Sequence, residues 1–380
     1  MRSSRAGAGR AVPVLLALTL MLGVTASSEA AKLSPDMSGK LDRTLSRTLA
    51  GTESPGAIVG VWVGGKRWTA AKGSTIRGAD IRPTRSIHTR IGSVTKTFTG
   101  TVILQLARER KLRLDDSIDR WFPWVPDAGR ITIRDLGSMA SGINTYSASG
   151  AVTDRYLTHP RTVWKPAELI ETGISLPPRF APGEGFFYSN TNFLMLGRIA
   201  EKVTGKPLAR LYRERIFDRL GMGDSSYPST TALPRPFWHG DTNQAVTGTP
   251  IRDATHWSPT FLGAAGQIVS TLSDLGRYTR ALGTGSLVGP AMQRQRLRPN
   301  PASVVGGRQY GFALGDDHGW LSHSGEVPGF NTQIAYLPSR RATVVILTNT
   351  DIPDADGLNP APAIFTALAE VISPGHVPGS

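Results

Sequence analysis

The stretch Ser93-Val94-Thr95-Lys96-Thr97-Phe98-Thr99-Gly100-Thr101-Val102-Ile103-Leu104-Gln105-Leu106-Ala107 is the most informative part of the sequence. Its apolar residues recur at the three- and four-residue spacing of an amphipathic helix. Ser93 and Lys96 would then lie on one face of this helix. The preceding residues 87–91 are typical of a strand and end at Gly92, so we expect Ser93 at the helix N-terminus, where free backbone N–H groups favour negative charge.

A serine next to a lysine can act as a nucleophile without a histidine or a metal ion. A hydroxyl group is a weak nucleophile near neutral pH and needs an adjacent base or cation. Lys96 can supply one, because a desolvated amine is either neutral and basic or charged and able to lower the pKa of its neighbours. Ser-x-x-Lys also arises by chance, so the interpretation depends on further motifs.

Two triplets further along the chain complete a pattern. Tyr188-Ser189-Asn190 is the only Tyr-x-Asn sequence among the eight tyrosines, and His323-Ser324-Gly325 is the only His or Lys followed by Ser/Thr-Gly. Three motifs in this order resemble those of the penicillin-recognising serine hydrolase superfamily, in particular the branch of class C β-lactamases, serine DD-peptidases and related esterases. The resemblance extends from about residue 55 to about residue 350.

The resemblance implies a catalytic role for three residues. Ser93 would form an acyl-enzyme, and Lys96 and Tyr188 would handle the protons. The sequence does not assign the general base between Lys96 and Tyr188. A phenol ordinarily titrates near pH 10, so Tyr188 would need cationic neighbours to act as a phenolate.

Substrate-binding roles follow from the same resemblance. Asn190 would bind the acyl-side amide of the substrate and touch Lys96. The triplet at 323–325 would lie on an edge strand that lines the cleft, with Gly325 allowing close approach of the substrate backbone. The N–H of Glu326, paired with that of Ser93, would form the oxyanion hole. Within the triplet, Ser324 would contact the substrate and His323 could change its charge near neutral pH.

The chain departs from the family pattern at Met139-Ala140-Ser141-Gly142, where many relatives have a histidine before the Ser-Gly pair. No motif residue depends on that histidine. One of the arginines after residue 280 is a candidate for binding a substrate carboxylate, but the sequence does not distinguish among them.

The pattern of segments predicts an α+β fold, with an antiparallel sheet flanked by helices and a mostly helical lobe inserted at about 111–285. Short connections favour antiparallel pairing, and Gly64-Gly65 is a typical hairpin turn. The expected strands are 57–63, 67–71, 320–323, 332–336 and 342–347, and the expected helices outside the motif are 41–49, 193–203, 208–220 and 362–372.

Residues 1–30 are expected to be a signal peptide, because three arginines precede an apolar run that ends near the small-residue site Ser28-Glu29-Ala30. Residues 31–380 would form a single serine hydrolase domain, and the protein would be secreted or extracytoplasmic. The chain has no cysteine, which excludes disulfides and thiol catalysis.

Composition and motifs limit the partners. The formal net charge of +14 suits association with anionic cell-wall polymers, whereas scattered basic residues and the lack of a recognisable module argue against nucleic acid. No metal site or cofactor is expected. The expected substrate is a D-alanyl-D-alanine-type peptide, with β-lactams as mimics. The alternatives are β-lactamase activity, a carboxyl-ester hydrolase on the same scaffold, and a catalytically silent wall-binding protein.

Overall fold

The computed structural model describes residue 7 and residues 31–244 and 250–379. The expected signal peptide lies, apart from Gly7, outside these residues. Residues 31–380 form one compact unit. Within the part of the chain that is described, no helix is both long and apolar enough to cross a membrane.

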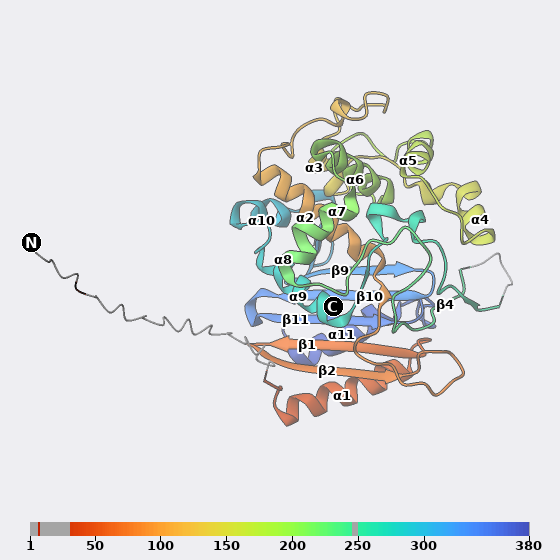
Figure 1. Cartoon of the computed structure of the whole chain (residues 1–380), viewed down its shortest axis with the longest axis vertical. Coiled ribbons are helices and arrows are strands. Elements are labelled where there is room, and N and C mark those ends of the chain that lie inside the picture. The colour runs from red at the N-terminus through yellow and green to blue at the C-terminus, as the bar shows by residue number, and fades with distance from the viewer. Residues whose placement is uncertain (1–6, 8–30, 245–249, 380) are drawn as a thin grey trace, which may run out of the picture. The chain divides into compact units, whose positions relative to one another are not determined.

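A seven-stranded antiparallel sheet forms the base of this unit, in the order β2-β1-β11-β10-β9-β8-β7 (Figure 1). Its strands are β1 (Gly56–Val63), β2 (Lys66–Gly73), β7 (Arg308–Tyr310), β8 (Gly315–Asp317), β9 (Trp320–Val327), β10 (Phe330–Leu337) and β11 (Ala342–Thr348). Gly64 and Gly65 both have positive φ, 57° and 83°, as the predicted two-residue hairpin turn requires. The sheet joins the start of the domain to its end, because β1 pairs with β11.

Both faces of the sheet are covered by helices. Along β11, Val344 and Ile346 belong to the core under α1 (Pro35–Ala50) and α11 (Pro360–Ile372), whereas Val345 and Leu347 belong to the larger core on the opposite face. Successive strand residues point to opposite faces, so a continuous apolar run marks a strand buried on both sides. The predicted α+β class with a helix-flanked antiparallel sheet is therefore confirmed.

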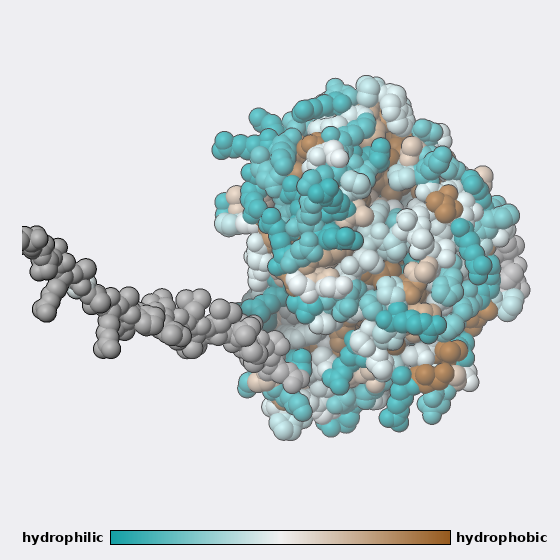
Figure 2. Space-filling model, viewed as in Figure 1, coloured by the Kyte–Doolittle hydropathy of each residue, from teal (hydrophilic) through white to brown (hydrophobic). Residues whose placement is uncertain are grey.

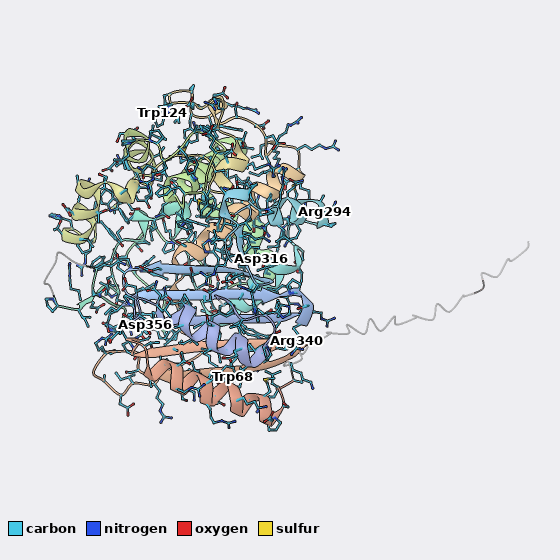
Figure 3. All side chains as sticks on the ribbon, turned by 180° about the vertical axis from the view of Figure 1, so that it is seen from behind. Trp68, Trp124, Arg294, Asp316, Arg340 and Asp356 are labelled. Carbon is cyan, nitrogen blue, oxygen red and sulfur yellow. The ribbon has the colours of Figure 1, made fainter. Side chains whose placement is uncertain are left out.

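Most of the remaining helices form a lobe at one side of the sheet. They are α3 (Ile133–Gly137), α4 (Gly150–Thr158), α5 (Pro166–Ser175), α6 (Asn190–Thr204), α7 (Leu208–Tyr212), α8 (Asp218–Leu220) and α10 (Pro290–Leu297). A π-helical segment, Arg213–Phe217, joins α7 to α8, so the predicted helix over 208–220 is one helical run of mixed geometry. In Figure 3, Trp124 marks the outer end of the lobe and Asp316 lies in β8 of the sheet.

Residues 272–284, included in the predicted lobe, behave differently. They form α9 (Leu272–Thr284), which packs on β1, β10 and β11. Two short strand pairs connect the layers: β3 (Thr89–Arg90) with β6 (Val269–Ser270), and β4 (Asp241–Thr242) with β5 (Arg252–Asp253). The strand expected at 87–91 is thus only two residues long.

The central helix α2 (Thr95–Arg108) is buried on all sides from Thr95 to Leu106. The expectation of an amphipathic helix was wrong, because the threonines of its polar face are buried and hydrogen-bonded. Thr99 Oγ1 donates to Ala264 O at 2.6 Å, and Arg296 Nη2 donates to Thr101 Oγ1 at 2.7 Å. Buried hydroxyls are tolerated when they have such partners.

The face shown in Figure 2 is mostly hydrophilic, and its hydrophobic residues form small separate spots. The exposed large apolar residues are likewise distant in sequence: Ile81, Trp124, Val163, Tyr188, Ile251, Leu297, Val304, Val305 and Leu358. Single exposed apolar residues are ordinary on a protein surface. Tyr188 and Leu358 differ from the others because they line the cleft described below.

Candidate active site

Ser93 lies at the entrance to the central helix. It is in a short 3₁₀ turn, Gly92–Val94, that leads directly into α2. Lys96 Nζ donates hydrogen bonds to Ser93 Oγ at 2.9 Å and to Ala265 O at 3.0 Å. Lys96 is fully buried, and this burial lowers its pKa well below the ordinary value. A neutral amine beside the hydroxyl can accept its proton.

Two glycines let the Ser93 turn lie directly against β9. A Cβ atom on Gly325 would be 2.0 Å from Ile91 O, and one on Gly92, whose φ is +51°, would be 2.6 Å from Glu326 N. The expectation that Gly325 makes room for the substrate was therefore wrong, because the chain's own 91–94 segment occupies that space. The contact brings together the segments that carry the N–H groups of Ser93 and Glu326.

The third motif lies on β9, which is an edge strand over only half of its length. Gly315–Asp317 of β8 pairs with residues 320–322, whereas 323–327 pair only with β10. The expectation of an edge strand thus holds for the motif but not for the strand, since a short β7–β8 hairpin covers the strand's first residues. Ser324 and Glu326 are exposed on one face of this free edge.

His323 is buried and held between two oxygen atoms. Its Nδ1 is 2.6 Å from Ser324 O, and its Nε2 is 3.1 Å from Tyr310 Oη. A carbonyl only accepts, so Nδ1 carries the proton and the Tyr310 hydroxyl donates to Nε2. Burial, followed by the charge of Lys96, lowers the pKa of His323 to about 4, against a smaller opposing effect of the Ser324 carbonyl. The expected change of charge near neutral pH was wrong, because this imidazole is neutral there.

Tyr188 completes the group around Ser93. Its ring centroid is 4.8 Å from Lys96 Nζ and 6.3 Å from the rings of His323 and Tyr310. Burial of the hydroxyl raises the pKa of Tyr188 above its usual value, and a hydrogen bond with Ser93 offsets part of this rise. Tyr188 is nevertheless 38% exposed, so solvent moderates the effect. Of the two candidate bases, Lys96 is the one whose environment favours the unprotonated form.

Asn190 is placed differently from the expectation. It is the first residue of α6, and only Ser189 before it has the expected extended backbone. Lys96 bonds Ser93 and Ala265 rather than Asn190. The Oδ1 atom of Asn190 is buried with no partner among the described residues. A buried amide oxygen without a partner is uncommon in proteins.

Two further residues of the site carry no sequence motif. Tyr310 on β7 orients His323, as described above. Met139, next to Ala140 at the position of the family departure, has φ of +62°, and its Sδ accepts a hydrogen bond from Ser189 N at 3.4 Å. Met139 therefore supports the turn that presents Tyr188. A tyrosine or methionine in a loop gives no local signal of such a role.

Ser93 and Tyr188 open into a cleft of about 870 Å³ that runs along β9 to α11. His323, Ser324 and Glu326 also line it. Arg308, one of the arginines after residue 280, lies in the cleft as well, but its Nε is 3.2 Å from Asp317 Oδ2. In the chain as described, no three His, Cys, Asp or Glu side chains are close enough together to hold a metal ion.

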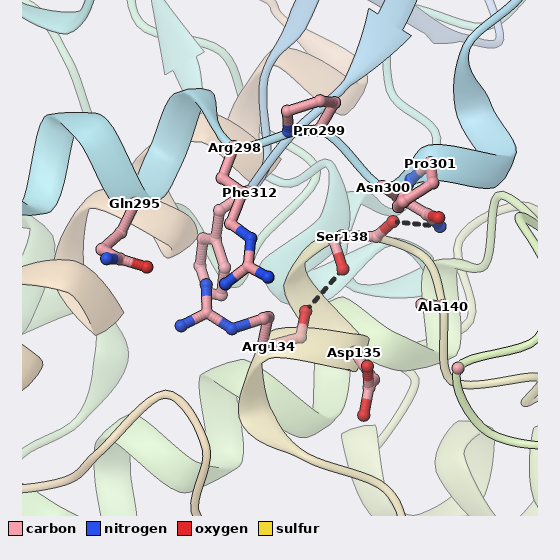
Figure 4. A pocket seen from close by; sticks show the side chains of 11 residues that line it. Arg134, Asp135, Ser138, Ala140, Gln295, Arg298, Pro299, Asn300, Pro301 and Phe312 are labelled. Carbon is pink, nitrogen blue, oxygen red and sulfur yellow. Dashed lines mark hydrogen bonds between the residues drawn. The ribbon is translucent and has the colours of Figure 1, made fainter.

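A smaller hollow of about 130 Å³ lies between α3 and the segment after α10 (Figure 4). It shares no residue with the Ser93 cleft, so it is separate from the chemistry. Within it, Asn300 Nδ2 donates to Ser138 O at 3.2 Å and to Gly185 O at 3.0 Å. Asn300 therefore ties the loop that leads to Tyr188 to the end of α3.

A nucleophilic serine beside a buried lysine, between an antiparallel sheet and a helical lobe, defines a serine hydrolase of the acyl-transfer type. The Beta-lactamase family model matches residues 41–369. The chain belongs to this family, as its three motifs predicted.

Relatives with related names support this assignment. The chain is 27% identical to penicillin-binding protein 4 of Amycolatopsis lactamdurans over 78% of this chain and 81% of that protein. It is also 27% identical to penicillin-binding protein 4* of Bacillus subtilis over 69% of this chain, but this match spans only 60% of that protein. Among solved structures, a D-stereospecific amidohydrolase from Streptomyces sp. is 27% identical with a TM-score of 0.78, covering 89% of this chain and 98% of that one.

A D-amino acid amidase from Ochrobactrum anthropi SV3 has the same fold, with a TM-score of 0.80 at 23% identity, over 89% of this chain and 99% of that one. This second structure therefore supports the fold of the chain.

Proposed function

We propose that this protein is an acyl-enzyme hydrolase that cleaves the amide bond following a D-amino acid residue, as in a D-alanyl-D-alanine-type peptide or, by mimicry, a β-lactam. The observation that carries the proposal is the buried Lys96 amine, 2.9 Å from Ser93 Oγ and with a lowered pKa. A carboxypeptidase and a β-lactamase would share this first step.

The chemistry proceeds in two halves. Lys96 takes the proton of Ser93 as Oγ attacks the carbonyl carbon. The N–H groups of Ser93 and Glu326 stabilise the oxyanion, each such donor contributing about 2.7–4 kcal/mol. The C–N bond breaks as Tyr188 passes a proton to the leaving amine, and Lys96 replaces that proton with the one it took from Ser93. Water, activated by the same groups, then attacks the ester of Ser93 and releases the acid.

The proposals that the protein is exported and that it binds wall polymers are based on the sequence alone. We propose that residues 1–30 direct export and that the mature protein acts outside the cytoplasm, where its net positive charge favours anionic wall polymers. Fractionation of cells that express the tagged chain, with N-terminal sequencing of the product, tests both points.

The test of the activity is an incubation with a fluorescent penicillin, followed by intact mass and label over time, with Ser93→Ala as control. A stable adduct confined to the parent supports a penicillin-binding peptidase, and rapid turnover supports a β-lactamase. No adduct, with p-nitrophenyl ester hydrolysis that still needs Ser93, supports the carboxyl-ester hydrolase. Loss of both activities, with no labelling by an active-serine phosphonate, would leave the silent binding protein.

A further inference from the structure

The Ser93 cleft is acidic, although the chain as a whole has a formal net charge of +14. Four carboxylates line it, against the single guanidinium of Arg308: Asp316, Asp317, Glu326 and Glu370. Because Arg308 is paired with Asp317, the lining as described presents no free cation. A cleft lined by one sign of charge concentrates ligands of the opposite sign.

Glu326 belongs to the segment of β9 that packs against the Ser93 turn. Its backbone contacts Gly92, the residue before Ser93. Its side chain is exposed on the same face of β9 as Ser324, and residues two apart on a strand are only about 7 Å apart. A substrate that extends along β9 from the oxyanion hole therefore meets this carboxylate.

The Glu326 carboxylate is fixed in place by neutral side chains. Burial raises its pKa, and the hydrogen bond from Asn359 opposes this rise. Asn359 Nδ2 donates to Oε2 at 2.5 Å, and Gln244 Nε2 donates to Oε1 at 3.2 Å. The same Gln244 Nε2 also donates to Asp351 Oδ2 at 2.6 Å. Two carboxylates thus share one neutral amide. No cation is paired with Glu326 or Asp351 in the described residues.

Asp351 is a second acid that shares Gln244 with Glu326. It is only 2% exposed. Burial raises its pKa to about 7, hydrogen bonds from Gly329 and Thr242 oppose this rise, and the Glu326 charge adds to it. A positive group placed between the cleft and these acids would relieve that repulsion.

We propose that Glu326 binds an ammonium group of the substrate, so that Ser93 acts preferentially on amides or short peptides whose acyl residue carries a free amine. This inference rests on the proposed function and names its substrate class. The described lining of the cleft has no unpaired cation that could bind a free carboxylate of the substrate in the same way. A fixed carboxylate costs little to order when the ligand binds, which makes it a selective contact.

The experiment compares two substrates of the full chain at neutral pH: D-alanine p-nitroanilide and its N-acetyl derivative. We expect kcat/KM for the free amine to exceed that for the acetylated substrate by about tenfold or more, the size of an ion-pair effect in a partly solvated cleft. In Glu326→Gln the ratio should fall toward one. Glu171→Gln, at an exposed position on α5 outside the cleft, is the matched control and should keep the parent ratio.

The outcomes separate this inference from the function on which it rests. A ratio at or below one in the parent, or an unchanged ratio in a Glu326→Gln variant that melts like the parent, overturns the role of Glu326. Should that variant fail to fold, the salt dependence of the parent decides, because screening must lower the ratio if charge causes it. Failure of an uncharged phosphonate to label Ser93 would instead refute the acyl-enzyme itself.

Discussion

Gly325→Ala should inactivate the protein without unfolding it. The added Cβ would lie 2.0 Å from Ile91 O, and real Cβ atoms essentially never come within 3.0 Å of such an atom. The Ser93 turn and β9 must therefore separate by at least about 1 Å, a displacement that can cost about 100-fold in rate when it misplaces reacting groups. Loss of one oxyanion donor has a similar effect, about 10²–10³-fold in kcat.

The stability cost should be smaller, about 1–3 kcal/mol, as for other overpacked sites. The assay is hydrolysis of p-nitrophenyl acetate, with urea unfolding measured on the same samples. Gly223→Ala is the control, because nothing lies within 4 Å of the added Cβ and the position is exposed. If Gly325→Ala keeps kcat within about twofold of the parent, the close contact between Gly325 and Ile91 does not set the geometry of the site.

Three further predictions concern Lys96, His323 and Asn300. Lys96→Met should lower the rate of ester hydrolysis by about 10²–10⁴-fold. The midpoint of urea unfolding should stay equal or rise, because an apolar chain replaces a buried amine. In the parent, the rate of hydrolysis should fall as the pH is lowered through the pKa of Lys96. His323 has a pKa of about 4 in the folded state and 6.5 in the unfolded state, so the unfolded state binds a proton first as the pH falls. Lowering the pH from 6.5 to 4 should therefore remove about 3 kcal/mol from the free energy of unfolding. Urea unfolding of His323→Gln should show a smaller loss of stability over this pH range. Asn300→Ala leaves Ser138 O and Gly185 O without this donor and should cost about 1–3 kcal/mol by urea unfolding, whereas a cost below about 0.5 kcal/mol would mean that water replaces the amide.

The sequence predicted those features that depend on local spacing. The serine and lysine share one side of a helical segment because they are three residues apart, and Lys96 indeed reaches Ser93 Oγ. The apolar run of β11 predicted a strand, and the glycine pair after β1 predicted its hairpin. In each case the residues that carry the information are neighbours in the chain.

The sequence did not reveal features that depend on contacts between segments far apart in the chain. The carbonyl of Ala265 and the hydroxyl of Tyr310 carry no signal of their own, yet each fixes a residue of the site. The pKa of His323 depends on burial, which the motif does not encode. Gly325 was read correctly as a place of close approach, but the approaching group belongs to the same chain and not to the substrate.

The pairing of β1 with β11 has a consequence for how the protein folds. Ala57 lies opposite Thr348, so the sheet cannot close until nearly the whole chain has left the ribosome. Pairing over such sequence distances is slow, because the entropy of loop closure is lost before the contacts form. An incomplete chain contains Ser93 and Lys96 but lacks the strand against which their turn packs. Hydrolytic activity should therefore appear late in synthesis, and it should be a sensitive reporter of the last folding step.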